Sequence, residues 1–287
     1  MLIRIKSDLH LNCYAAALHQ TRLYDPNEEP FDPFWYPPEL PTDKDTVLIL
    51  AGDLWEGTKW VEYAGYSWIE KVAPRFKQVL VVLGNHCLWS NGGLSIQNGA
   101  DKCNAMLQDH CLFNVHVLDC ASMQIDDVLF VGATLWTDMN KRDPLAMMNM
   151  TRYMRNDGNI AFSTGPNGQW ERFTSERWVH THDKHRKYIQ HVCEQNRDKK
   201  IVVITHHVPL LGIGEPAYRG DVANAYYESD LSELILDNPQ IKGWVYGHTH
   251  YQREELFGET LMVNNNVGYA FEHHEEQGLV QHKVWEI

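Results

Sequence analysis

The 287-residue chain lacks the long apolar runs that membrane-spanning helices require. Apolar stretches such as residues 47–51 and 79–84 are far shorter than the roughly 20 residues that cross a bilayer. The N-terminus also lacks a basic region followed by an apolar stretch and a small-residue cleavage site. It begins with residues 2–6, which alternate like a strand. We therefore expect no membrane segment, no secretory signal and a cytoplasmic location.

Basic residues are scarce as well. The sequence has 25 Lys and Arg against 38 Asp and Glu, for a formal net charge of −13. Non-specific affinity for long nucleic acids comes largely from basic side chains on phosphates, so such a partner is disfavoured. A nucleotide or another small phosphorylated substrate remains compatible, because bound cations would supply local positive charge. The abundance of histidine, at 16 residues, points to metal chemistry.

Cysteine pairs are missing too. The six cysteines form no C-x-x-C pair and no disulfide-framework rhythm; they are Cys13, Cys87, Cys103, Cys111, Cys120 and Cys193. In a cytoplasmic chain of this size, we expect them to be mostly buried thiols.

Short apolar, β-branched runs bounded by turn residues predict buried strands. These runs are residues 2–6, 47–51, 79–83, 128–132, 201–205, 243–246 and 261–263. Helices are expected over residues 58–76, 174–195 and 230–236. Strands that alternate with helices predict an α/β architecture. We interpret residues 1–287 as a single domain with insertions near 24–41 and 138–170.

The two insertions differ in composition. Residues 24–41 hold six of the chain's twelve prolines together with Phe34, Trp35 and Tyr36, which predicts an ordered loop. These aromatic side chains either pack within the protein or stack on a base or sugar. Residues 138–170 are rich in Met, Asn, Gly and Arg without a clear period. They form either a lid or binding loop, or a packed excursion.

Polar side chains follow five of the predicted strands directly. In chain order they are Asp8, His10, Asp53, Asn85, His86, His206, His207, His248 and His250. Ligand sites of α/β sheets lie at the carboxyl ends of the strands, so we expect these groups to converge. Carboxylate, carboxamide and imidazole together suit divalent Mn, Fe, Co, Ni or Zn. Cysteine is absent from the set, which disfavours a closed structural zinc site.

The segments that carry these residues resemble the five blocks of the calcineurin-like metallophosphoesterase family. The blocks are Asp8-Leu9-His10, Gly52-Asp53, Gly84-Asn85-His86, Val203-Ile204-Thr205-His206 and Gly247-His248-Thr249-His250. The resemblance implies an α/β (α+β) fold, a four-layer αββα sandwich of two facing mixed sheets flanked by helices. More locally, residues 132–136, 156–157 and 218–221 resemble stretches of a bacterial branch of this family.

The resemblance also implies a role for each matching residue. One divalent cation would be held by Asp8, His10, Asp53 and His250. The other would be held by Asp53, Asn85, His206 and His248, with Asp53 as the bridge. His86 would be the acid that protonates the leaving group. The family often has an acidic residue directly after its Gly-Asn-His, where this chain has Cys87, so the group that orients His86 is left open.

These roles suggest hydrolysis of a phosphate ester by a hydroxide that bridges two metal ions. Substrate contacts are assigned to His207 and Arg219, although His207 could instead be a packing residue and Arg219 an ordinary surface residue. The charged helix over residues 174–195 carries further histidines, which we expect on a solvated face; they are His180, His182, His185 and His191.

Two other functions compete with a phosphomonoesterase or phosphodiesterase that acts on a small or nucleotide-like substrate. A nuclease acting on DNA or RNA would need a basic groove, which the acidic composition disfavours. A non-catalytic, metal-holding interaction scaffold would be expected to have lost ligands or His86, and all of them are present. An enzyme is therefore favoured, without an assignment of its substrate, its native metals or its oligomeric state.

Overall fold

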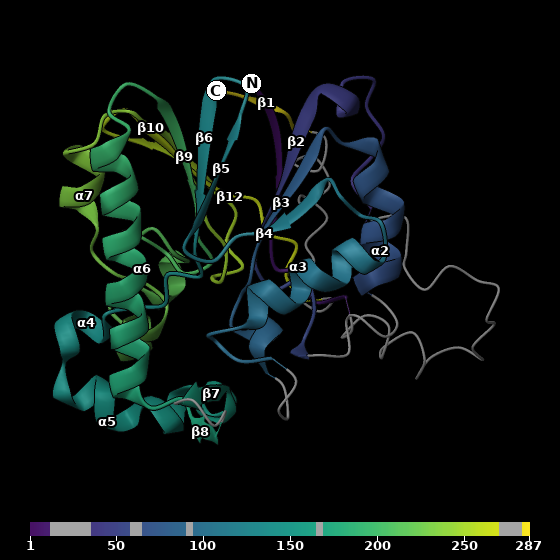
Figure 1. Cartoon of the computed structure of the whole chain (residues 1–287). Coiled ribbons are helices and arrows are strands. Elements are labelled where there is room, and N and C mark those ends of the chain that lie inside the picture. The colour runs from purple at the N-terminus through teal and green to yellow at the C-terminus, as the bar shows by residue number, and fades with distance from the viewer. Residues whose placement is uncertain (12–35, 58–64, 90–93, 165–168, 270–282) are drawn as a thin grey trace.

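The computed structural model describes residues 1–11, 36–57, 65–89, 94–164, 169–269 and 283–287. Most of the first predicted insertion, the start of the helix expected at 58–76, and Cys13 lie outside these residues. Within them, two mixed sheets face each other and carry helices on their outer sides (Figure 1). The predicted four-layer αββα sandwich is confirmed.

The first sheet has the strand order β13-β1-β2-β3-β4. Its strands are β1 (Leu2–Lys6), β2 (Thr46–Ala51), β3 (Gln78–Val82), β4 (Val115–Val117) and β13 (Trp285–Glu286). Strands β1 to β4 are parallel, and β13 is antiparallel to β1. The carboxyl ends of β1, β2 and β3 therefore lie at one edge of the sheet.

The second sheet has the order β11-β12-β10-β9-β6-β5. Its strands are β5 (Ala121–Ile125), β6 (Val128–Gly132), β9 (Lys200–Ile204), β10 (Ile241–Val245), β11 (Arg253–Phe257) and β12 (Thr260–Asn264). The four central strands are parallel, and the edge strands β5 and β11 are antiparallel to their neighbours. The central strands are almost wholly buried, which explains why their sequences are continuous apolar runs.

An apolar layer joins the two sheets. It contains Ile5 and Ile49 from the first sheet and Phe130, Val202 and Val245 from the second. Alternate residues of the same strands point outwards, because successive side chains of a strand project to opposite faces. The sandwich therefore has a core between its sheets and a further apolar layer beneath each set of helices.

Helices α2 (Gly65–Val72) and α3 (Gly99–Asp109) lie outside the first sheet, whereas α6 (Ser175–Gln195) and α7 (Ser232–Leu236) lie outside the second (Figure 1). Helix α6 begins where the sequence predicts, since the Thr174 hydroxyl accepts a hydrogen bond from the Arg177 backbone N–H. The helix expected to reach residue 76 ends at Val72, because Pro74 interrupts the α-helical pattern and only a 3₁₀ turn follows.

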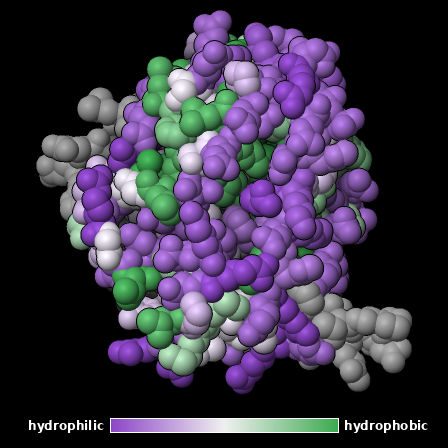
Figure 2. All heavy atoms as spheres, turned by 90° about the vertical axis from the view of Figure 1, so that its left-hand side faces the viewer, coloured by the Kyte–Doolittle hydropathy of each residue, from purple (hydrophilic) through white to green (hydrophobic). Residues whose placement is uncertain are grey.

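The expectation of a fully solvated set of histidines on α6 is wrong for two of them. The side of the molecule on which α6 lies has a largely hydrophilic surface (Figure 2). His182 and His185, however, are buried beneath the helix and contact the backbone of Leu135 and Trp136. Their ring nitrogens serve as hydrogen-bond partners for a buried loop, a role that the charged neighbours in the sequence conceal.

The second predicted insertion contains regular elements within its described residues. It forms α4 (Met139–Arg142), α5 (Pro144–Tyr153), the 3₁₀ turn η6 (Asp157–Asn159) and a small two-stranded sheet of β7 (Ala161–Thr164) and β8 (Gln169–Arg172). Pro144 begins α5, and the Asp143 side chain caps it by accepting from the N–H groups of Leu145 and Ala146. Residues 153–157 line the cleft described below.

Candidate metal centre and active-site cleft

The loops that follow β1 and β2 run side by side and place Asp8 and His10 next to Asp53. The N–H of Asp8 donates to the Gly52 carbonyl at 2.9 Å, and the N–H of His10 donates to the Asp53 carbonyl at 2.9 Å. The parallel pairing of the two strands thus continues into their loops. In the second sheet, the Gly247 N–H donates to the His206 carbonyl at 3.0 Å and brings the loops after β9 and β10 together.

Most of the predicted ligands adopt a left-handed backbone conformation. The φ angle is positive, between 43° and 73°, at Asp8, His10, Asp53, His248 and His250. Asp and His tolerate this region better than most residues, yet each such position typically costs about 1–3 kcal/mol. Such strain persists where the surrounding structure determines the conformation, and here it turns the side chains towards one centre.

Two glycines allow the backbone to pass against these side chains. A Cβ at Gly52 would overlap the His206 ring, with His206 Cγ only 2.6 Å away. A Cβ at Gly84 would overlap the Asp53 carboxylate and lie 2.6 Å from the Asp53 backbone nitrogen. Any larger residue at either position would therefore displace a predicted ligand.

The structure brings all the predicted ligands together at the ends of both sheets. His206 Nε2 lies 3.2 Å from Asp53 Oδ2 and 3.0 Å from Asn85 Oδ1. On the other side, His250 Nε2 lies 3.5 Å from Asp8 Oδ1 and 3.1 Å from His10 Nε2. Asp53 belongs both to a group with His10 and His86 and to a group with His206 and His248, and the ligand atoms of each group lie within 4.8 Å of one another.

These contacts fit divalent cations better than they fit hydrogen bonds alone. His10 Nδ1 and His248 Nε2 are buried and have no hydrogen-bond partner in the described part of the chain. The two facing Nε2 atoms of His10 and His250 can share only a single proton, and otherwise their lone pairs repel. Carboxylate, amide and imidazole donors at these separations are those that first-row transition metals and zinc accept.

The electrostatics of the cluster are dominated by burial and by its two carboxylates. Burial lowers the pKa of His206, but the adjacent Asp53 carboxylate outweighs this effect and raises that pKa to about 9. Burial alone would raise the pKa of Asp53, yet the nearby imidazoles of His206 and His86 bring it well below its ordinary value. Burial lowers the pKa of His10 to about 4. Most ligands are therefore already in the deprotonated form that metals bind, and His206 must lose a proton.

Glu56 resolves the question of what orients His86. Its Oε1 lies 3.1 Å from His86 Nδ1, in the same turn that carries Asp53. An Nδ1–H that donates to this carboxylate leaves His86 Nε2 facing the cleft, 4.0 Å from Asp53 Oδ2. Glu56 is not among the residues predicted from the sequence, because the acid was expected directly after His86.

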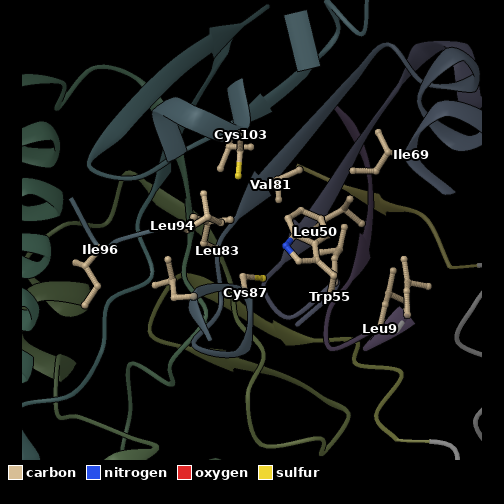
Figure 3. Packing of buried hydrophobic residues seen from close by; sticks show 14 of the residues in the cluster. Leu9, Leu50, Trp55, Ile69, Val81, Leu83, Cys87, Leu94, Ile96 and Cys103 are labelled. Carbon is tan, nitrogen blue, oxygen red and sulfur yellow. The ribbon is translucent and has the colours of Figure 1, made fainter. Parts of the chain in front are cut away.

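Cys87 does not take this role, because His86 Nδ1 is paired with Glu56 and the Cys87 thiol lies 4.0 Å from Asp53 Oδ1 instead. It is fully buried in the apolar cluster outside the first sheet, among Leu50, Leu83 and Cys103 (Figure 3). Burial raises the pKa of its thiol, so the group stays neutral. Cys103 and Cys193 are also buried free thiols, as expected, whereas Cys111 is exposed.

Aromatic side chains that the sequence analysis did not single out surround the two central histidines. The Trp89 ring stacks on His86 with centroids 3.5 Å apart. The Tyr269 ring stacks on His10 at 4.3 Å, and its hydroxyl lies 3.5 Å from His86 Nε2. Both rings line the cleft and restrict how a substrate can approach His86.

A cleft of about 1540 Å³ opens over the cluster. One wall comes from the second insertion and includes Arg155 and Asp157, and another comes from the loop between β9 and β10 and includes Tyr218 and Arg219. Arg219 is exposed on this wall, within the same cleft as His86 and Asp53. Its position is compatible with the substrate contact expected from the sequence.

His207 lies elsewhere. It is completely buried, packs against Trp136 and His248, and does not line the cleft. Its Nδ1 lies 3.3 Å from the Thr134 carbonyl. This placement fits the alternative of a packing residue behind His248.

Within the part of the chain that the structure describes, one further cluster of metal-binding residue types lies outside the cleft and consists of Asp119, Cys120 and His185. His185 Nδ1 accepts a hydrogen bond from the Leu135 N–H at 3.0 Å, so the proton of the neutral ring sits on Nε2. That nitrogen faces Asp119 Oδ1 at 3.3 Å. A protonated Nε2 cannot bind a cation. Among the described residues neither Nε2 nor Asp119 Oδ1 makes a hydrogen bond, so the cluster is an electrostatic contact between α6 and the turn before β5.

Facing mixed sheets with a buried centre of Asp, Asn and His side chains at their strand ends define the class of metallophosphoesterases. The family model of the calcineurin-like phosphoesterases matches residues 1–252, and the chain belongs to that family. An uncharacterized protein of Acanthamoeba polyphaga mimivirus is 24% identical over 285 residues, which cover 94% of this chain and 92% of the viral one.

The fold is also found in a solved structure. A phosphopantetheinyl hydrolase from Mycobacterium tuberculosis superposes with a TM-score of 0.62 at 18% identity, covering 94% of this chain and 90% of the other. A dimetal phosphatase from Danio rerio matches with a TM-score of 0.46 at 10% identity, over 92% and 86% of the two chains.

Among the described residues, no helix is both long and apolar enough to span a membrane.

Proposed function

We propose that this protein is a dinuclear-metal-dependent hydrolase of phosphate esters on small or nucleotide-like substrates. The observation that carries the proposal is the convergence of Asp8, His10, Asp53, Asn85, His206, His248 and His250 on one buried centre at the floor of a cleft, with His86 beside it. Manganese, iron, zinc, cobalt and nickel all suit this donor set.

The proposed ligands form two groups, one for each cation. Asp8, His10 and His250 would hold one cation, and Asn85, His206 and His248 would hold the other. Asp53, which lies within reach of both groups, would be the shared ligand. Bound divalent cations supply Lewis-acid polarisation of a phosphate and a nucleophile at neutral pH.

His86 is the proposed general acid. Its Nδ1 is engaged by Glu56, and its Nε2 is directed into the cleft. From there it can donate a proton to the departing oxygen of the substrate, an effect typically worth roughly 10²–10⁴ in rate. Trp89 fixes the plane of the ring from one side. Tyr269 places a hydroxyl next to the same nitrogen and can contact the same substrate oxygen.

The walls of the cleft favour a small substrate over a long nucleic acid. Arg155 and Arg219 are joined there by Glu215, Asp221 and Glu228, so the walls are not a basic groove. Arg219 is the proposed contact for an anionic group of the substrate beyond the scissile phosphate. His207 is proposed to support His248 by packing.

A substrate screen tests the proposal. The purified protein, loaded separately with each candidate metal, is assayed against phosphomonoesters, phosphodiesters, cyclic nucleotides and oligonucleotides. A phosphopantetheinyl ester is included because a structural neighbour is a phosphopantetheinyl hydrolase. We expect turnover of at least one small ester and none by Asp53→Asn. Efficient cleavage of oligonucleotides alone would favour a nuclease, and metal binding without turnover of any ester would favour a scaffold.

A further inference from the structure

The second insertion delivers a carboxylate to the wall of the cleft. Asp157 lies at the start of η6, is only 2% exposed and lines the cleft together with Asn85 and His86. The turn that carries it is anchored by backbone hydrogen bonds from Gly158 to Met154 at 3.1 Å and from Phe173 to Ile160 at 3.1 Å. A buried carboxylate is costly unless hydrogen bonds satisfy it, so its partners explain why it lies there.

A single oxygen of Asp157 accepts hydrogen bonds from two residues of the metal-site turn. Asn85 Nδ2 donates to Asp157 Oδ1 at 2.9 Å, and Trp89 Nε1 donates to the same oxygen at 3.2 Å. These donors lie on either side of His86 in the sequence, at the two ends of the turn η5 (His86–Leu88). Asp157 therefore ties both ends of the turn that carries the proposed acid to the second insertion.

The bond to Asn85 fixes which end of the amide faces the metal centre. A carboxamide can bind a cation only through its oxygen, because its nitrogen is a donor without a free lone pair. With Nδ2 bonded to Asp157, Asn85 Oδ1 faces His206 Nε2 at 3.0 Å. Rotation of the amide by 180° would lose this arrangement and present N–H groups to the cation.

The bond to Trp89 has a separate consequence. It fixes the indole in the plane that stacks on His86 at 3.5 Å. The imidazole is then held by Glu56 through Nδ1 and by Trp89 across its face. Loss of this bond would free the indole without touching any predicted ligand.

We propose that Asp157 is a positioning residue that orients Asn85 as a ligand of the second cation and steadies His86 through Trp89. This inference rests on the proposed function. It assigns the second insertion a part in the metal centre in addition to its place in the wall of the cleft.

Titration of metal into the metal-free protein tests the inference without an activity assay. Asp157→Leu removes the acceptor, and Asp157→Asn keeps an oxygen at its position. Loss of a group that supports a metal ligand typically weakens binding by about 10–100-fold. We expect Asp157→Leu to lower the affinity for one of the two ions by this amount and to leave the affinity for the other unchanged. Asp157→Asn should keep both affinities within about threefold, and Asn159→Ala, an exposed change in the same turn, should keep both unchanged.

Trp89→Phe tests the support of His86 separately from the orientation of Asn85. It keeps an aromatic ring over His86 but lacks the N–H, so both ion affinities should stay unchanged while esters with poor leaving groups are slowed more than nitrophenyl esters. Asp157→Leu with both affinities intact, or with both weakened equally, would overturn the inference. If the wild type binds two ions but hydrolyses no ester, the proposed function is wrong, whereas the effect of Asp157→Leu on metal affinity still supports the role of Asp157. If the wild type binds fewer than two ions, the proposed function and the role of Asp157 are both wrong.

Discussion

Among the described residues, two regions bring acidic and histidine side chains together, and they differ in how their ring nitrogens are used. At the floor of the cleft, His10 and His250 face each other at 3.1 Å, and His248 Nε2 has no partner among the described residues. Beneath α6, His185 Nδ1 accepts a hydrogen bond from the Leu135 N–H, so the neutral ring carries its proton on Nε2. That Nε2 lies 3.3 Å from Asp119 Oδ1 and, like His248 Nε2, makes no hydrogen bond among the described residues.

The difference shows that residue types alone do not define a metal site. Both clusters combine a carboxylate with imidazole, and both contain atoms within 4.8 Å of one another. A backbone donor fixes the proton of His185 on the nitrogen that a cation would need. In the cleft, the left-handed turns and close-packed glycines aim lone pairs at a common centre. Four experiments test this distinction.

The largest contrast is expected between Asp53→Asn and Asp119→Asn. Asp53→Asn removes the carboxylate shared by both halves of the proposed centre, and we expect kcat/KM to fall by about 10³-fold or more, beyond the 10–100-fold typical of groups that only support a ligand. Asp119→Asn should leave kcat/KM within about twofold, because surface-side changes away from the site have small effects. Similar losses in both variants, each with wild-type circular dichroism, would contradict the distinction.

His86→Gln is expected to have the next largest effect. Removal of the proposed acid should slow esters of poor leaving groups by about 10²-fold or more, in line with general acid catalysis. Nitrophenyl esters should be slowed much less, because their leaving group needs no proton. Rates measured over a series of leaving groups check this expectation, and equal slowing throughout the series would remove His86 from the acid role.

The pH dependence of metal binding probes the cleft cluster directly. In the metal-free protein, the pKa of His206 is raised to about 9, so the ring is protonated at pH 7 and must lose its proton when a cation binds. Affinity should therefore rise nearly tenfold from pH 7 to 8 and about fivefold more from pH 8 to 9, roughly 50-fold in all, for one displaced proton with a pKa of about 9. Calorimetric titration in buffers of different ionisation enthalpy counts the proton, and binding at pH 7 without its release would contradict this assignment.

The smallest expected effect belongs to the cluster beneath α6. Burial lowers the pKa of His185 to about 4, so the unfolded chain binds more protons below its ordinary value of 6.5, and acid destabilises the fold. Between pH 6.5 and 5 this contributes about 2 kcal/mol, at 1.36 kcal/mol per unit.

His185→Gln keeps a donor for Asp119 but cannot take up a proton. Its free energy of unfolding, measured in urea with the metal-free protein, should fall less steeply with acidification than that of the wild type. If the free energies of unfolding of the two proteins fall equally steeply with acidification, His185 does not take up a proton on unfolding.

The buried parallel strands of the fold could be predicted from the sequence, because each has a local pattern of apolar residues. Buried parallel strands appear as continuous apolar runs, and β1 and β6 match their predicted bounds. The ligands follow the strands directly, so Asp8, Asp53 and His206 could be located from order alone. Short or half-exposed elements such as β5 and β11 were missed, because they are edge strands without a continuous apolar run and their residues alternate between half-buried and exposed.

The supporting residues of the site could not be found in this way. Glu56, Asp157 and Tyr269 come from a turn, an insertion and the segment after β12, and only the tertiary fold brings them to His86 and Asn85. Burial of His182 and His185 was equally hidden, since charged residues alternate with them along α6. Signals existed for some of them: Glu56 shares the turn of Asp53, and residues 156–157 lie in a segment with family resemblance.

A crystal structure of the manganese-loaded protein, with anomalous data collected at a wavelength sensitive to manganese, would show whether the side chains in the cleft hold two cations. We expect two anomalous peaks in contact with Asp53, one beside His10 and His250 and the other beside Asn85 and His206, with no peak between Asp119 and His185. A single peak away from Asp53, or an ion bound to His185, would contradict this expectation.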